Sequence, residues 1–323
     1  MKRCSFVILV CFTFMISGCN NTQSFNVPKT DQPMAIVAHV KKQEITFLDV
    51  VQNQVLGSED SHFLITEMVS IENGTIVATS QSEDSLLLYN IEKRSVSPFL
   101  KLNQGLTAIQ YDQTSRNLFV TDIVNDQVHQ IDMKREELVQ SIEVDSYPTD
   151  LEFGFDELFV LSGERNHVTV TDLKLQTTLQ TFPVLERPSG MYYDGENLWI
   201  GGHGSFGELN KRILAYDPNT GREVNEIEVG LMPIDFFGDR NSPYFYVLCH
   251  GDHGLYKVNK ETNEVEDVIE VGQNPNFVTG NEDRLFVTNL DGNSLSIIDR
   301  HSFELIEEVP VATGPYAIIL LED

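Results

Sequence analysis

The chain has 323 residues, enough for one large all-β domain or for two smaller domains, and its 49 acidic and 22 basic residues give a net charge of −27. A surface of this charge repels phosphate backbones and anionic lipid headgroups, so nucleic-acid binding is disfavoured and a cationic or basic partner is favoured. Three of the four cysteines lie within the first 19 residues, so the remainder of the chain has Cys249 alone and depends on an apolar core instead of disulfides.

The N-terminus predicts a lipoprotein signal. Two basic residues, Lys2 and Arg3, precede an apolar run over residues 4–16 that has the length of a signal peptide and is short for a membrane span. The run ends in Ile-Ser-Gly-Cys19, which resembles the bacterial lipobox and makes Cys19 the expected site of lipidation. An ordinary secretory signal with an incidental cysteine is the alternative.

The predicted organisation is therefore a signal peptide and lipobox over residues 1–19, a flexible tether over residues 20–32, and one domain over residues 33–323. The tether is predicted because residues 20–32 are polar and lack periodicity. We expect a protein on the outer face of the bacterial cytoplasmic membrane, held to the membrane only by its N-terminal lipid.

Three sequence markers recur in the domain with a period near 40 residues. The second strand-like run of each repeat has an aromatic or apolar core, a proline precedes most repeats, and the third run often ends in Asp or Asn before a turn. These last residues are spaced 41, 42, 40, 45, 42 and 40 positions apart: Asp49, Asn90, Asp132, Asp172, Asp217, Asn259 and Asp299. A period near 40 made of four short strands is typical of β-propeller blades. Helical repeats are excluded because the apolar runs alternate with period two and are interrupted by Gly, Asp and Asn.

The ends of the chain predict how the ring closes. Six complete repeats begin near residues 63, 106, 148, 188, 233 and 275. Residues 35–57 supply only three strands, and residues 314–321 supply one strand with no continuation. The two ends together predict a seventh blade, and hence an all-β, seven-bladed propeller.

Several motifs resemble the YVTN repeat family of seven-bladed β-propellers. They are Phe-Val-Thr-Asn at 286–289, the later Ile-Ile-Asp299, and Gly-x-x-Pro at 230–233 and 272–275. The similarity covers about residues 33–323, and the first two blades depart from it. The resemblance implies the fold but no single function, because family members include surface-layer, binding and uncharacterised proteins.

Most of the recurring polar residues are interpreted as structural. An Asp that ends a strand accepts backbone N–H bonds at the first position of a turn, as expected for Asp217 before Pro-Asn-Thr-Gly. Trp199 lies in a second-strand core and is expected to pack between blades. Cys249 ends an apolar run and is expected to be buried and unreactive.

Candidate functional residues lie in the loops between second and third strands, which the resemblance implies gather around the mouth of the axial channel. The longest of these loops contains His203, and the corresponding loop of the next blade contains His250, Asp252 and His253. Imidazoles and a carboxylate from adjacent loops can bind a divalent transition metal or act in acid–base chemistry. The possible metal ligands are His203, His250 and His253.

The remaining rim candidates are polar residues of the same predicted face. Two arginines are notable in so acidic a chain, because they could anchor an anionic ligand, with salt bridges to nearby carboxylates as the alternative. The other three end or follow second strands. These candidates are Arg165, Arg187, Asp122, Asn289 and Asp291.

The leading functional hypothesis is a monomeric binding or scaffold protein whose loop face and channel mouth hold an envelope protein, a peptide or a small ligand. The alternatives are a metal-assisted hydrolase or lactonase-like enzyme, and a sensor or assembly partner of a cell-envelope complex. The sequence leaves open the ligand, the presence of a metal, and whether the protein is catalytic, because a fold does not determine a function.

Overall fold

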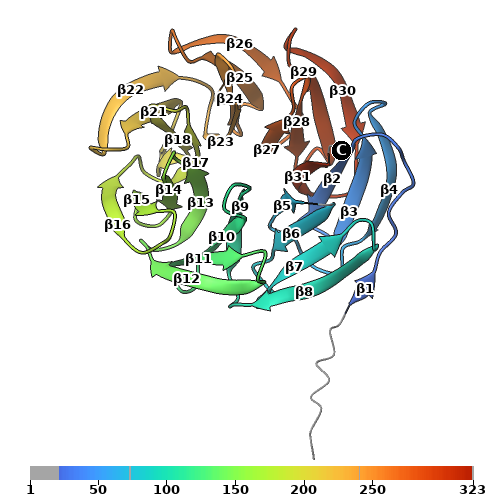
Figure 1. Cartoon of the computed structure of the whole chain (residues 1–323). Helices are drawn as coiled ribbons and strands as arrows, with labels where there is room; N and C mark the ends of the chain where they lie inside the picture. The colour runs from blue at the N-terminus through green and yellow to red at the C-terminus, as the bar shows by residue number, and fades with distance from the viewer. Residues whose placement is uncertain (1–21, 73, 240, 322–323) are drawn as a thin grey trace, which may run out of the picture.

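The computed structural model describes residues 22–72, 74–239 and 241–321 and arranges them as seven antiparallel sheets around one axis (Figure 1). These residues contain strands and no helices. Six sheets, blades 1 to 6, follow one another along the chain, and a closing blade combines strands from both ends. The predicted seven-bladed β-propeller is confirmed.

Each blade has four strands that run in order from the axis to the outside of the ring (Figure 1). Blade 1 consists of β5 (Glu67–Ile71), β6 (Thr75–Thr79), β7 (Ser85–Asn90) and β8 (Ser95–Lys101). Blade 2 consists of β9 (Leu106–Asp112), β10 (Asn117–Asp122), β11 (Gln127–Asp132) and β12 (Glu137–Glu143). Blade 3 consists of β13 (Pro148–Phe153), β14 (Glu157–Ser162), β15 (His167–Asp172) and β16 (Thr178–Pro183).

Blade 4 consists of β17 (Pro188–Tyr193), β18 (Leu198–Gly202), β21 (Arg212–Asp217) and β22 (Arg222–Glu228), with a small hairpin of β19 (Gly204–Ser205) and β20 (Glu208–Leu209). Blade 5 consists of β23 (Pro233–Gly238), β24 (Tyr244–Cys249), β25 (Gly254–Asn259) and β26 (Glu264–Glu270). Blade 6 consists of β27 (Pro275–Gly280), β28 (Arg284–Asn289), β29 (Ser294–Asp299) and β30 (Glu304–Pro310). The closing blade consists of β31 (Pro315–Leu321), β2 (Met34–His39), β3 (Glu44–Asp49) and β4 (Gln54–Asp60).

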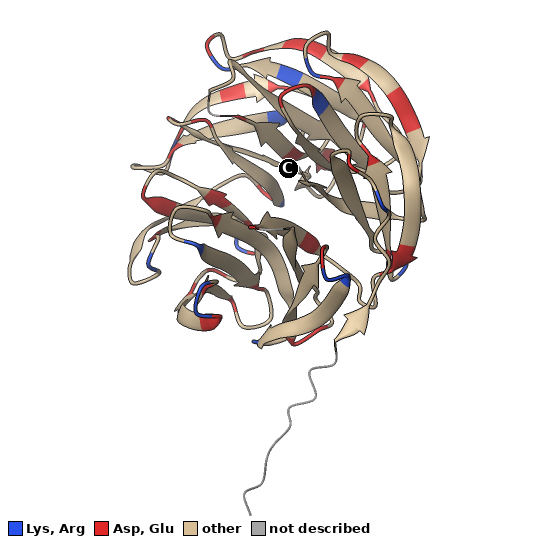
Figure 2. Ribbon diagram, turned by 45° about the vertical axis from the view of Figure 1, so that its right-hand side comes forward, with Lys and Arg blue, Asp and Glu red and all other residues tan. Residues whose placement is uncertain are grey.

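The apolar core lies between neighbouring blades, as expected for sheets that cannot cover both faces alone. Trp199 of blade 4 is 1% exposed and lies 5.5 Å, between ring centroids, from Phe245 of blade 5. Cys249 is fully buried in the same cluster, and burial raises the pKa of its thiol. The predicted packing of Trp199 between blades and the predicted burial of Cys249 are confirmed. The outermost strands instead face water: β26 and β30 are rich in Glu, and Figure 2 shows acidic bands along the outside of the ring.

The ring closes through antiparallel pairing of β31 with β2, in which Ile318 lies opposite Val37 and Ile319 opposite Ile36. The backbone N–H of Val40 also donates to the carbonyl of Gly314 at 2.9 Å. Strands from the two ends of the chain therefore lie side by side in one sheet (Figure 1).

The Asp residues that end third strands hold the following turns, as predicted. Oδ1 of Asp132 accepts the backbone N–H groups of Lys134 and Arg135 at 2.8 and 3.0 Å. Oδ1 of Asp299 does the same for His301 and Ser302 at 2.9 and 2.8 Å. These carboxylates are thus committed to turn geometry.

The predicted tether requires a correction within residues 20–32. β1 (Gln23–Ser24) pairs with β8 as a fifth strand on the outside of blade 1. Phe25 is 4% exposed and packs edge-on against Tyr89, with 5.7 Å between ring centroids, and Val27 is buried beside it. Residues 23–28 of this segment are therefore a packed arm, because two apolar side chains fill the seam between blade 1 and the closing blade.

The predicted signal peptide and Cys19 lie outside the described residues. Within the described ranges, no helix has the length and apolar character to cross a membrane.

Deleting residues 314–323 should abolish cooperative folding. The deletion removes β31, including buried Ile318 and Ile319, and exposes the inner edge of β2. Burial of each such side chain contributes about 1.5–3 kcal/mol, against a total stability of about 5–15 kcal/mol for a typical domain. Thermal unfolding followed by circular dichroism should show no sharp transition, and a synthetic peptide of residues 313–323 should restore it. A truncated protein that melts like the full chain would contradict the proposed closure.

Candidate functional site

The first strands of the seven blades surround an axial cavity of about 350 Å³. Each blade contributes to its wall, mostly with hydroxyl and amide side chains from the start of the first strand. These residues are Thr66, Thr107, Thr149, Ser189, Ile234, Asn276 and Tyr316. Its mouth is lined by loop residues, including Gln81 and Tyr147, on the face where the loops between second and third strands were predicted to gather. The volume is that of a small-molecule site.

Three carboxylates, here called the axial carboxylates, also line this cavity: Glu67, Asp150 and Asp235. They occupy equivalent positions in the first strands of blades 1, 3 and 5. Each accepts a backbone N–H from the first strand of the following blade. These bonds are Ile109 N–H to Glu67 at 3.1 Å, Met191 N–H to Asp150 at 2.9 Å and Val278 N–H to Asp235 at 2.7 Å.

The surroundings of the axial carboxylates favour their protonated forms. Burial raises the pKa of Asp150 to about 7. Burial, with a further contribution from the charge of Asp150, raises the pKa of Asp235 to about 8. Burial, with contributions from the charges of Asp150 and Asp235, raises the pKa of Glu67 well above its usual range. The backbone N–H bonds oppose this change but are outweighed by the loss of hydration. Within the described ranges, none of the three belongs to an ion pair.

His203 and His250 meet at the cavity mouth, where their ring centroids lie 6.2 Å apart. The first follows β18 and the second follows β24, so adjacent blades place them together. Burial lowers the pKa of His203, with further contributions from Arg187 and His250, so its imidazole is neutral at pH 7. The Nδ1 atom of His250 is buried and has no hydrogen-bond partner among the described residues.

The other residues of this predicted group have separate surroundings. Asp252 is exposed and accepts the hydroxyl of Tyr256 at 2.7 Å. His253 takes the left-handed position of its turn, with φ of 58°, and its carbonyl accepts the N–H of Val271. Among the described residues, no three His, Cys, Asp or Glu side chains are grouped as a metal site requires. The trio of His203, His250 and His253 is therefore not assembled.

The two predicted arginines lie in different places: Arg187 beside the histidine pair, and Arg165 on the outer rim. The guanidinium of Arg187 sits 4.8 Å from the ring centroid of Phe206, and its carbonyl accepts the N–H of His203 at 2.9 Å. Arg165 is exposed on the neighbouring blade.

The three remaining candidates hold the structure together. Asp122 is fully buried and accepts the N–H groups of Val124 and Asn125 at 3.0 and 2.9 Å. Asn289 is fully buried and donates to the hydroxyls of Ser294 and Ser296, each at 3.0 Å. Asp291 pairs with Lys41 at 2.6 Å, which ties blade 6 to the closing blade.

The axial carboxylates were missed by sequence reasoning, although a signal was present. Asp150 and Asp235 stand two positions after the recurring proline, in Pro-Thr-Asp150 and Pro-Ile-Asp235. A carboxylate in the innermost strand of a propeller points to the axis or to a neighbouring strand, and a comparison of the repeats position by position would have singled it out.

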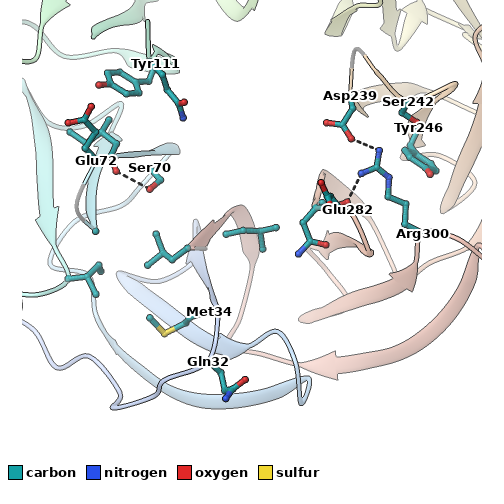
Figure 3. A pocket seen from close by; sticks show the side chains of 18 of the residues that line it. Gln32, Met34, Ser70, Glu72, Tyr111, Asp239, Ser242, Tyr246, Glu282 and Arg300 are labelled. Carbon is teal, nitrogen blue, oxygen red and sulfur yellow. Dashed lines mark hydrogen bonds and ion pairs between the residues drawn. The ribbon is translucent and has the colours of Figure 1, made fainter. Parts of the chain in front are cut away.

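A larger basin of about 1580 Å³ lies at the opposite face, between the turns of blades 1, 2, 5 and 6 and the packed arm. Figure 3 shows Glu72 and Tyr111 on one wall and Arg300 on the other. Two of its charged side chains already have ion-pair partners: Arg300 pairs with Asp239 at 2.5 Å, and Glu72 pairs with Arg116 at 2.8 Å. The axial cavity, whose carboxylates lack such partners, is the better candidate for a ligand site.

No protein-family model and no curated protein matches the chain. Solved structures match over most of its length. Apo AztD from Citrobacter koseri is 12% identical with a TM-score of 0.62, covering 91% of this chain and 98% of its own. A functionally unknown protein from Desulfotomaculum acetoxidans is 11% identical with a TM-score of 0.72, covering 90% and 99%. Kuenenia stuttgartiensis hydrazine synthase is 14% identical with a TM-score of 0.65, covering 80% and 95%. At these identities the likeness establishes the fold alone.

The axial carboxylates should make the protein less stable as the pH rises. A carboxyl group whose pKa is higher in the folded than in the unfolded chain binds its proton more tightly when folded. The free energy of unfolding therefore falls between pH of about 4, the usual pKa of Asp, and pH of about 8, the folded value for Asp235. Urea titrations at pH 5 and pH 8 should show this decline.

The double variant Asp150→Asn, Asp235→Asn should reduce the decline by on the order of 1–2 kcal/mol, because an amide retains the acceptor oxygen but does not titrate. Asp156→Asn, at an exposed turn, is the matched control and should leave the decline unchanged. An identical decline in the wild type and the double variant would show that these groups do not titrate abnormally.

Proposed function

We propose that this protein is an extracytoplasmic binding propeller that holds a small organic cation in its axial cavity. The observation that carries the proposal is the set of three axial carboxylates, which line a cavity of about 350 Å³ and have no cationic partner among the described residues. A bound ammonium group would favour the ionised forms of these carboxyl groups and pair with them.

The chemistry of the wall supports an organic cation over a bare metal ion. The carboxylates alternate with hydroxyl and amide groups from the neighbouring blades, which suit the N–H and O–H groups of an amine or amino alcohol. Because a cation favours the charged form of each carboxylate, binding near pH 7 should release protons. His203 and His250 at the mouth offer further hydrogen-bonding atoms.

The alternative of a metal-assisted hydrolase would use His203 and His250 as the first two ligands. A catalytic zinc site of the usual kind takes three protein ligands, and the described residues offer no such group.

Relationship to the YVTN repeat family remains part of this proposal, supported by the motifs in blades 5 and 6 and by the seven-bladed fold.

Lipid anchoring at Cys19 would orient the propeller. β1 begins at Gln23, and four residues of extended chain span about 14 Å, so blade 1 would lie close to the membrane. The arm then continues along the basin, which is lined by Val27 and Pro28. The face that carries the mouth of the axial cavity would point away from the membrane, where a ligand can reach it.

Calorimetric titration with putrescine and choline, and with neutral 1,4-butanediol as the comparison, tests the ligand class. At least one cation should bind, and the diol should not. Asp150→Asn or Asp235→Asn should each weaken binding about tenfold or more, which corresponds to about 1.4 kcal/mol. Titrations at pH 7 in buffers of different ionisation enthalpy should reveal proton release.

Asp156→Asn serves again as the control and should bind like the wild type. Equal affinity for the diol, no binding of either cation at millimolar concentration, or full affinity in the Asp235→Asn variant would each refute a cation site at the axis.

Cys19→Ser should release the protein from the membrane fraction and abolish its labelling by radioactive palmitate, because the substitution removes the acylated thiol. Cys11→Ser is the matched control, since it changes a cysteine inside the predicted signal, and labelling should persist. Labelling that survives in Cys19→Ser would rule out anchoring at this residue.

A further inference from the structure

The loop of blade 4 differs in length and form from its counterparts. Residues 203–211 connect β18 to β21, whereas four or five residues connect the second and third strands of the other blades. The additional residues form the hairpin of β19 and β20, here called the blade-4 hairpin. The fold does not need this insertion, because six blades form their sheets without it.

The blade-4 hairpin is held in one shape by its own hydrogen bonds. Gly204 pairs with Leu209 and Ser205 with Glu208. At its base, the side-chain amide of Asn210 donates to the carbonyls of Gly202 and Arg212 at 3.1 and 2.7 Å. Gly204 has φ of 79°, and a Cβ added there would lie 2.7 Å from the backbone nitrogen of Asn210, so only glycine fits.

This rigid hairpin presents Phe206 to solvent. The side chain is 93% exposed, the highest value among the large apolar side chains of the described residues, and Leu209 beside it is 46% exposed. The guanidinium of Arg187 stacks 4.8 Å from the Phe206 ring and supports it from one side. Single exposed apolar residues are common on protein surfaces. A rigid inserted hairpin with an aromatic tip over an arginine instead has the composition and preorganisation of a binding hot spot.

The charge around the hairpin differs from that of the molecule. The protein carries −27 overall, whereas in the hairpin and the adjoining loops Lys211, Arg187 and Arg165 are matched in number by Glu208, Glu186 and Glu164. None of the three basic residues belongs to an ion pair within the described ranges, whereas Arg212 is paired with Glu226 at 2.6 Å. The hairpin is thus much less acidic than the molecule as a whole, and the guanidinium of Arg187 directly beside Phe206 is placed to contact a carboxylate of a partner.

We propose that the blade-4 hairpin is a docking element for a partner protein, with Phe206 inserted into an apolar pocket whose rim carries Asp or Glu. A protein is favoured over a lipid surface because the hairpin lies on the face opposite the basin that the N-terminal arm lines, an argument that rests on the proposed anchoring at Cys19. This proposal does not require a ligand in the axial cavity, since Phe206 is not part of the cavity wall.

Photo-crosslinking in intact cells, using p-benzoylphenylalanine at position 206 of the full chain, tests the proposal. Position 155 is the matched control, because Phe155 is also exposed, at 69%, on a turn between β13 and β14 at the opposite end of the blade. A discrete protein should be crosslinked from position 206 and not from position 155. That protein is then purified and its affinity measured by calorimetry.

Phe206→Ala should weaken binding of the purified partner at least 50-fold, Phe206→Leu less, and Arg187→Gln about tenfold, while Phe155→Ala should have no effect. Thermal melting of Phe206→Ala should match the wild type, because the removed side chain is exposed in the free protein.

Three results would overturn the proposal: no discrete crosslinked protein, full affinity of Phe206→Ala for the captured protein, or binding to vesicles of phosphatidylcholine and phosphatidylglycerol that Phe206→Ala abolishes. The last result would identify the hairpin as a membrane contact.

Discussion

The pairing of β31 with β2 is the interaction on which the rest of the structure depends. Each blade packs only against its two neighbours, so a ring left open would expose the apolar face of a blade at either side of the gap. The side-chain contacts across the seam reinforce the backbone pairing: Lys41 reaches Asp291 of blade 6, and Arg284 of blade 6 donates to the carbonyl of Val50. Closure fixes the ring size, and ring size fixes how closely the seven first strands approach the axis.

The axial carboxylates follow from that constraint and connect stability with binding. First strands of neighbouring blades do not form a sheet with one another, so Glu67, Asp150 and Asp235 each bridge to the next strand through a backbone N–H. The same positions place three acids in a confined space, where loss of hydration outweighs those hydrogen bonds. A ligand that restores the charged state would therefore stabilise both the site and the contacts between blades.

Much of the fold could be predicted because the repeat makes it local. The apolar cores and the turn-forming Asp132 and Asp299 follow from patterns within 40 residues, and the split closing blade follows from the incomplete repeats at the two ends of the chain. A comparison of the repeats would single out Asp150 and Asp235, but not their common cavity, because its size depends on the radius of the closed ring. The packed arm was missed because Phe25 and Val27 are only two apolar residues in a polar segment, too short an alternation to predict a strand, and they are buried only by the seam they fill. That His203 and His250 lie together could be predicted from the order of the blades alone. The position of His253 could not, because it depends on the left-handed backbone of its turn.

The two faces of the ring are unequal, and the inequality bears on function. One face receives the N-terminal arm, and its basin contains charges such as Arg300 and Asp239 that neutralise each other. The other face opens into the axial cavity and carries the one hairpin that the repeat does not explain. His203 joins these two features, since its ring lines the mouth and its carbonyl accepts the N–H of Asn210 at the base of the hairpin. A partner bound at Phe206 would therefore contact a hairpin whose base is hydrogen-bonded to a residue at the mouth of the cavity.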